Sequence, residues 1–181
     1  MSPMNPLELL EHETEIAFAD LLQAIEGVDE RLSYATLQLK PDEYLHSNGS
    51  IIGLVQHIAC CKAIYASVAF RNVEIKWGDL AEKFDMIGQS WEATIEDLHA
   101  SHRYWLDAWK DIAPGELDKL VRHQSGKEWP AWEIITLMHQ HDQYHAGQIE
   151  ILKVSLQPTD APPEHNEAHD IREYCRDSPF W

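Results

Sequence analysis

Apolar residues recur along most of this chain at steps of three and four, the spacing that gathers them on one face of an α-helix. The pattern predicts four long helices, over residues 6–28, 51–70, 91–113 and 130–156. A short helical stretch is expected over residues 30–39, because Pro41 follows and stops it. No segment is predicted to form a strand.

The predicted helices begin and end at residues with matching conformational preferences. Ser50 and Ser90 offer N-cap side chains to the second and third long helices, and Pro130 suits the first turn of the fourth. Pro114 and Pro158 follow the third and fourth helices and prevent their continuation.

Four long helices without a strand predict an all-α protein, an antiparallel four-helix bundle over residues 1–157. Residues 40–49 are expected to form a loop, and residues 71–88 a long, partly helical connection of the kind that shapes a pocket mouth in bundles. Residues 158–181 form a Pro-containing C-terminal extension. Three aromatic residues favour docking of this extension on the bundle or on a neighbouring chain: Tyr174, Phe180 and Trp181.

Overall charge narrows the range of partners. The chain has 181 residues, enough for one domain with a core, and a formal net charge of −17. This negative field repels phosphate backbones, which argues against nucleic acid as a partner, and it concentrates cations near any pocket that carries metal ligands.

Three cysteines without a CxxC pair argue against a disulfide framework. With no signal peptide and no apolar run of membrane-spanning length recognised, we expect a cytoplasmic protein that does not enter a membrane.

Candidate chemistry lies on the apolar face of the fourth helix. His141 and His145 are four residues apart and therefore rise from one side of that helix, within reach of a single ion. Two buried imidazoles without partners would cost roughly 1–3 kcal/mol for each unsatisfied group. A divalent metal removes that cost, and neutral imidazole suits zinc, nickel, iron or copper.

His57 is the candidate third ligand, because it lies in the middle of the second helix on an apolar stripe. Its depth matches the middle of the fourth helix if the two helices face each other. Three histidines leave a coordination position for water or substrate, as in catalytic zinc sites. The alternative is a hydrogen-bonded pair of buried histidines on the fourth helix, with His57 as an ordinary core residue.

Four further residues are candidates for the pocket around the metal. Cys61 and Tyr65 lie one and two turns after the candidate ligand of the second helix, and His102 faces inward on the third. Gln148 lies one turn after the histidine pair, where it could hold a metal-bound water or a substrate carbonyl. The alternatives are a small buried hydrophobe for Cys61, a structural role for His102 and an ordinary core amide for Gln148.

Two segments carry a resemblance to a known family: HDQYHAGQIEIL, which starts at His141, and GSIIGLVQHIACCKAIY, which contains His57. They resemble the DinB-like (DinB/YfiT) superfamily of four-helix metalloproteins. In that family, one histidine of the second helix and an HxxxHxGQI-type element of the fourth bind a divalent metal, usually zinc or nickel. The resemblance spans about residues 6–156 and implies the ligand role for three residues: His57, His141 and His145.

The resemblance also implies a class of function. Family members use a low-molecular-weight thiol in transferases that act on electrophiles or in isomerases, and they often form homodimers, so we expect a small-molecule substrate. A metal-activated water in a hydrolase fits the same ligands, and only the resemblance ranks thiol transfer above it. The alternative is a non-catalytic, metal-binding stress-response protein in which the ion pins the second helix to the fourth. A further protein ligand, such as Cys61 or His102, would favour that alternative.

Overall fold

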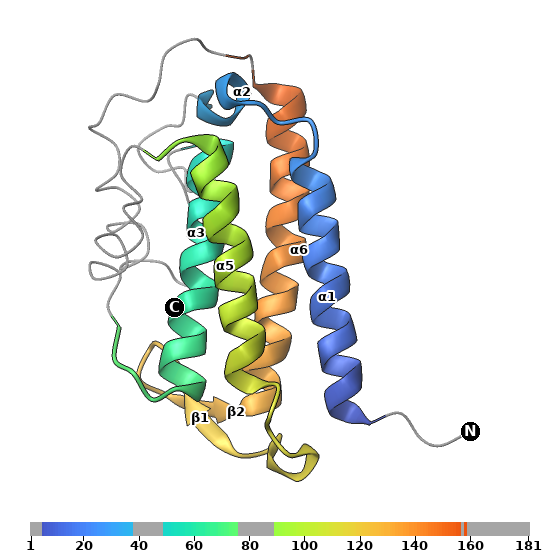
Figure 1. Cartoon of the computed structure of the whole chain (residues 1–181), viewed down its shortest axis with the longest axis vertical. Coiled ribbons are helices and arrows are strands. Elements are labelled where there is room, and N and C mark those ends of the chain that lie inside the picture. The colour runs from blue at the N-terminus through green and yellow to red at the C-terminus, as the bar shows by residue number, and fades with distance from the viewer. Residues whose placement is uncertain (1–4, 38–48, 76–88, 157, 159–181) are drawn as a thin grey trace.

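The computed structural model describes residues 5–37, 49–75, 89–156 and 158, and it shows an all-α bundle (Figure 1). The four long helices expected from the sequence are confirmed, and the short helix ends at Tyr34, earlier than expected. The helices are α1 Pro6–Ile25, α2 Glu30–Tyr34, α3 Ile51–Tyr65, α5 Trp91–Trp109 and α6 Ala131–Ser155. Apart from Pro158, the predicted C-terminal extension lies outside the described residues.

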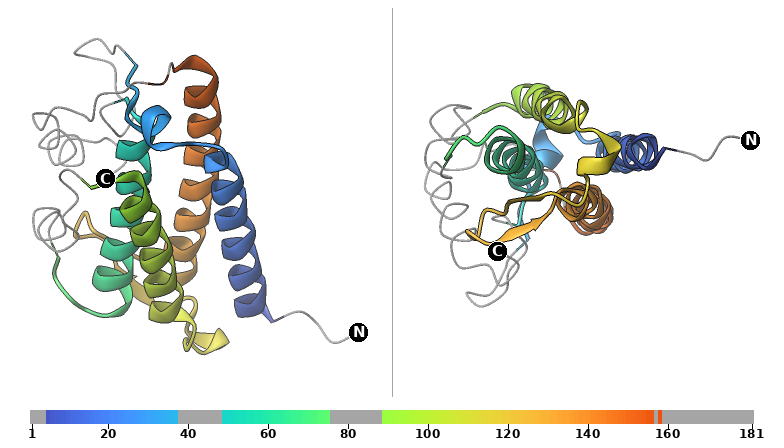
Figure 2. Two further views of the ribbon diagram at one scale, coloured as in Figure 1. Left: turned by 45° about the horizontal axis from the view of Figure 1, so that its top comes forward. Right: turned by 90° about the horizontal axis from the view of Figure 1, so that it is seen from below.

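The four long helices form two pairs. α1 packs most extensively against α6, and α3 packs most extensively against α5. In Figure 1, α1 and α6 run in one direction and α3 and α5 in the other, while the end-on view of Figure 2 shows all four around a common core. The pairs are therefore antiparallel to each other, as the predicted bundle requires, and the helices within a pair are parallel. Such a topology needs a long crossover between α3 and α5.

Two serine caps lie where the sequence predicts them. The Oγ atoms of Ser50 and Ser90 accept the backbone N–H three residues along, at 3.1 and 3.2 Å, and so fix the starts of α3 and α5. Pro130 occupies the N-cap position of α6 instead of its first turn, and the helix begins at Ala131.

A short β-hairpin closes the end of the bundle where α5 ends and α6 begins (Figure 1). Strand β1 spans Leu120–Arg122 and pairs antiparallel with β2, Glu128–Pro130; a 3-10 turn, Pro114–Glu116, precedes them. Gly126 completes the hairpin loop with a φ of 81°, a conformation that favours glycine. The expectation of no strand was therefore wrong, because strands of three residues are too short to show an alternating pattern.

α3 continues without a break into a π-helical turn, Ala66–Phe70, so the helical stretch ends where predicted. Residues 71–75 are not helical, and Asn72 turns the chain with a φ of 51°. The remainder of the predicted connection and most of the predicted loop over residues 40–49 lie outside the described residues.

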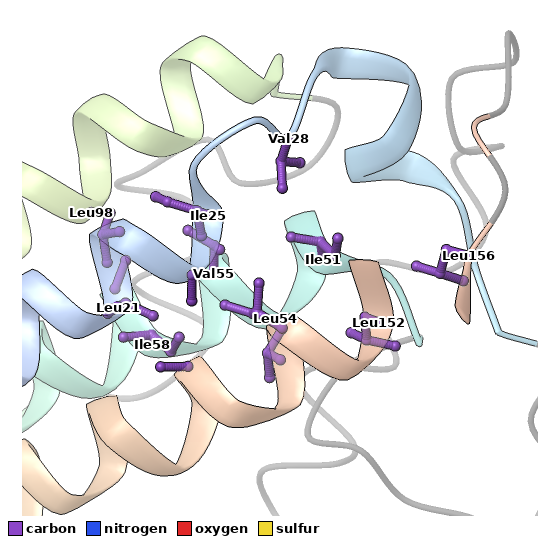
Figure 3. Close-up of a cluster of buried hydrophobic side chains, with 14 of the residues drawn as sticks. Leu21, Ile25, Val28, Ile51, Leu54, Val55, Ile58, Leu98, Leu152 and Leu156 are labelled. Atoms are coloured by element: carbon purple, nitrogen blue, oxygen red, sulfur yellow. The ribbon is translucent and has the colours of Figure 1, made fainter. Parts of the chain in front are cut away.

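α3 is the most completely buried of the long helices, and every residue from Ile51 to Tyr65 is buried. The stretch Ile51–Phe70 is long and apolar enough to cross a membrane, with a mean hydropathy of 1.5, which corrects the expectation that no segment has this length. Of its apolar window, 94% is buried inside the bundle, as in the core helix of a soluble protein. Figure 3 shows side chains of α1, α3 and α6 packed together in this core: Leu21, Ile25, Leu54, Val55, Ile58 and Leu152.

Candidate metal centre

Three histidines from α3 and α6 meet inside the bundle. His57 lies in the middle of the buried helix α3, while His141 and His145 lie on successive turns of α6. One ring nitrogen from each lies within 4.8 Å of the others. His57 and His145 are buried and His141 is partly exposed, so the cluster approaches the surface on the side of His141.

The close contacts join Nε2 atoms. His141 Nε2 lies 3.1 Å from His57 Nε2 and 3.0 Å from His145 Nε2. An ion held tetrahedrally by nitrogens at roughly 2.0–2.1 Å would place those nitrogens about 3.3 Å apart. The two contacts made by His141 Nε2 are therefore already close to the spacing that a zinc-like ion needs.

Hydrogen bonds between neutral rings account for this cluster poorly. A neutral imidazole carries one N–H, and an N–H at His141 Nε2 can point at His57 or at His145, but not at both. A cation that accepts the lone pairs of all three nitrogens satisfies both contacts together. The donor set therefore fits a divalent metal ion.

Gln148 fixes the orientation of His145. His145 Nδ1 lies 2.6 Å from Gln148 Oε1, and because an amide oxygen can only accept, the proton is on Nδ1. Gln148 Nε2 in turn donates to the hydroxyl of Tyr144 at 3.1 Å. A neutral His145 protonated at Nδ1 presents an Nε2 lone pair to the cluster, which is the form that binds a metal. The structure thus places Gln148 behind a candidate ligand.

Cys61 borders the cluster on the side of α3. Its Sγ lies 3.6 Å from His57 Nε2, and the side chain is buried. Within the described residues, the donors that are all mutually close come from the three histidines, and Cys61 is not among them. A set of three nitrogens leaves a coordination position for an exogenous ligand.

Tyr65 points toward the hairpin. Its hydroxyl lies 2.9 Å from Nε2 of His123, a residue that sequence reasoning did not single out. His123 Nδ1 accepts the backbone N–H of Ser125 at 3.0 Å, so its proton lies on Nε2 and is donated to Tyr65. Burial raises the pKa of Tyr65 and lowers the pKa of His123. This contact joins the end of α3 to the hairpin.

His102 faces α1. Its ring stacks on Phe18 with the centroids 3.6 Å apart, and its Nε2 lies 3.5 Å from Glu15 Oε2. Burial lowers the pKa of His102 to about 3. His102 is not part of the mutually close donor set.

The bundle also contains an interior ion pair that was not predicted from the sequence. Lys62 Nζ lies 2.5 Å from Asp142 Oδ2, and neither side chain is exposed. Burial raises the pKa of the Asp142 carboxyl, an effect that the Lys62 ammonium opposes. The signal that the sequence offered was a lysine inside a predominantly apolar helix.

A cavity of about 750 Å³ lies at the hairpin end of the bundle. The π-helical turn, the end of α5 and the hairpin line it, with side chains that include Val68, Phe70, Ile112, Val121 and Arg122. Its described lining includes none of the three histidines, so this cavity is separate from the metal centre.

Comparison with known proteins identifies the family. None of the curated proteins matches the chain. The model of the DinB superfamily matches residues 13–149, a span that covers well over half of the chain and contains all three histidines of the cluster. This bears out the resemblance seen in the sequence, and the chain therefore belongs to the DinB superfamily.

Proposed function

We propose that His57, His141 and His145 bind one divalent metal ion, zinc or nickel, in an enzyme that joins a low-molecular-weight thiol to a small electrophile or uses it in an isomerisation. The observation that carries the metal site is that Nε2 of His141 lies 3.1 Å from Nε2 of His57 on the other helix and 3.0 Å from Nε2 of His145. Family membership supports the thiol chemistry.

The residues of the chain would hold and orient the reactants. A bound divalent ion supplies Lewis acidity, which lowers the pKa of a thiol or water toward neutrality. The buried helix α3 fixes His57, and Gln148 fixes the ring of His145. Partial exposure of His141 gives a substrate a way to approach. The nucleophile comes from the thiol, so no serine or cysteine nucleophile of the chain is required.

A second candidate function is a structural metal without catalysis. Its support is that the three ligands join α3 to α6, helices that belong to different pairs of the bundle. An ion in this position would tie the pairs together and stabilise the fold by mass action.

Metal binding itself is tested first. Protein purified without an affinity tag should contain about one metal ion per chain, and the variants His57→Ala and His141→Ala should lose it while keeping their helical circular dichroism. His139→Ala is the matched control, because His139 lies on α6 two residues from His141 and therefore faces another direction. Stoichiometric metal in either ligand variant would contradict the site.

The two functions are then separated with cobalt. If the site is catalytic, the visible spectrum of the cobalt-loaded protein should shift when small thiols are added, because a thiol sulfur enters the coordination shell. A spectrum that no thiol changes would favour the structural metal. The hydrolase alternative predicts that the wild-type protein hydrolyses ester or amide substrates and that His141→Ala loses this activity. It predicts no product from reactions between a thiol and an electrophile.

A further inference from the structure

The ion pair of Lys62 and Asp142 lies on the two helices that carry the histidines. Asp142 directly follows His141 in α6, and Lys62 directly follows Cys61, whose sulfur contacts His57. Lys62 Nζ and Asp142 Oδ2 are 2.5 Å apart, with both side chains at 0% exposure. The pair is thus a direct link between α3 and α6 close to the metal centre.

Stability alone does not explain this pair. Two charges removed from water lose their hydration, and apolar residues of similar volume often give an equally stable or more stable core. In the part of the chain that the structure describes, Asp142 Oδ1 is buried without a hydrogen-bond partner, which adds to the cost. A directional role for the pair therefore explains its presence better than a stabilising one.

The interface between α3 and α6 is where a directional contact is needed. This interface is smaller than the one between α1 and α6 or the one between α3 and α5. Apolar packing permits helices to slide and rotate by small amounts, whereas a short contact between two charged groups fixes both distance and direction. Lys62 also lies over the ring of Phe18 at 5.4 Å, which limits its own movement.

We propose that the Lys62–Asp142 pair is a positioning device that holds α6 against α3 in the register that brings the Nε2 atoms of His57 and His141 together before an ion binds. The proposal rests on the metal centre proposed above. Both residues act through the ligands and neither contacts the ion.

The double variant Lys62→Met/Asp142→Leu tests this role. It removes one positive and one negative charge, so the net charge is unchanged, and it replaces the pair with apolar side chains of similar length. We expect the metal-free double variant to melt at or above the wild-type temperature, because replacing a buried ion pair with apolar residues is often neutral or stabilising. Both residues are changed together because a single variant would leave an unpaired buried charge. We also expect it to bind cobalt at least tenfold more weakly, with a changed visible absorption spectrum.

Thr94→Val provides a matched control. Thr94 accepts a hydrogen bond from Gln56 at 3.5 Å, and Gln56 directly precedes His57. That contact ties α3 to α5 instead of α6, so its loss should leave cobalt affinity and spectrum as in the wild type.

A second variant keeps the test decisive if the double variant does not fold. Asp142→Glu retains the charge and the pair but lengthens the link by one methylene, which should displace α6 and weaken cobalt binding while the helical signal persists. Wild-type affinity and spectrum in a folded double variant, or in Asp142→Glu where the double variant fails to fold, would overturn the positioning role alone. A wild-type protein that binds no cobalt would overturn the metal centre itself.

Discussion

At the scale of single residues, His102 shows how burial can keep a histidine neutral far into the acidic range. Burial is the main cause that lowers the pKa of His102 to about 3, and the positive charge of Lys62 adds to it. Glu15 lies 3.5 Å away but is 53% exposed, so solvent screens its opposing charge. The groups around His102 are Lys62 from α3, Glu15 from α1, and His99 and Arg103 from its own helix.

This shift predicts the pH dependence of stability. The unfolded chain takes up a proton at His102 near pH 6.5, whereas the folded protein does so only near pH 3. Between these values the unfolded state binds more protons, so the free energy of unfolding should fall as pH falls, by up to about 1.4 kcal/mol per pH unit for this one group.

Urea unfolding of the metal-free protein between pH 7 and pH 4 provides the measurement. His102→Phe should flatten the profile, because it removes the titrating group and retains the stacking on Phe18. The exposed His12→Gln on α1 is the control for the loss of a histidine and should keep the wild-type slope. Equal slopes in wild type and His102→Phe would contradict the prediction.

The sequence predicted the places of some residues in and around the site but not of others. The spacing of His141 and His145 and the mid-helix position of His57, together with the family resemblance, predicted that they meet, although metal binding by them stays a prediction. Lys62 and Asp142 are 80 positions apart, and their contact depends on how α3 and α6 rotate against each other. Helical periodicity defines which face is apolar, but it does not define the rotation of two apolar faces to within one side chain.

At the scale of the elements, the serine caps make a measurable contribution. Ser90 Oγ accepts the N–H of Ala93 at 3.2 Å at the start of α5. Ser90→Ala removes that acceptor and should cost about 1 kcal/mol of stability. For a chain of this size, the melting temperature should fall by roughly 2–4 °C.

Thermal melts followed by circular dichroism test the cap. Ser155→Ala at the exposed end of α6 is the matched control, since it makes the same chemical change where no N-cap exists. A Ser90→Ala protein that melts together with the Ser155→Ala protein would show that the cap does not stabilise α5.

Element boundaries could be predicted where they depend on local chemistry. The starts of α3 and α5 follow from Ser50 and Ser90, which cap them through their own side chains. The hairpin depends on tertiary packing instead, because Val121 and Trp129 pair across it and pack against the core at the end of the bundle. A three-residue strand carries too little pattern to reveal such packing.

At the scale of the whole molecule, the metal should act as a stabilising ligand. An ion that binds the folded state alone, present at 100 times its dissociation constant, adds about 2.7 kcal/mol to the free energy of unfolding. The melting temperature should therefore rise by roughly 5–10 °C when zinc or nickel is added to metal-free protein. Differential scanning calorimetry of His57→Ala should show no such rise. An equal rise in that variant would show that the stabilising ion binds at a different site.

The arrangement of the helices could be predicted only in part. Four amphipathic helices indicate a bundle, but the parallel course of α1 with α6 and of α3 with α5 depends on a crossover whose direction local periodicity does not encode. The expected homodimer, the cytoplasmic location and the docking of residues 158–181 stay predictions from the sequence.

The pairing of α1 with α6 has a consequence for how the chain folds. These helices are neighbours in space, yet α2, α3, α5 and the hairpin separate them in the sequence. Closing so long a loop costs chain entropy, and folds dominated by contacts distant in sequence form slowly. During synthesis the apolar face of α1 must therefore remain exposed, or be covered only temporarily, until α6 has been made. Because His141 and His145 lie on α6, the ligand cluster is completed in the same late step that closes the core.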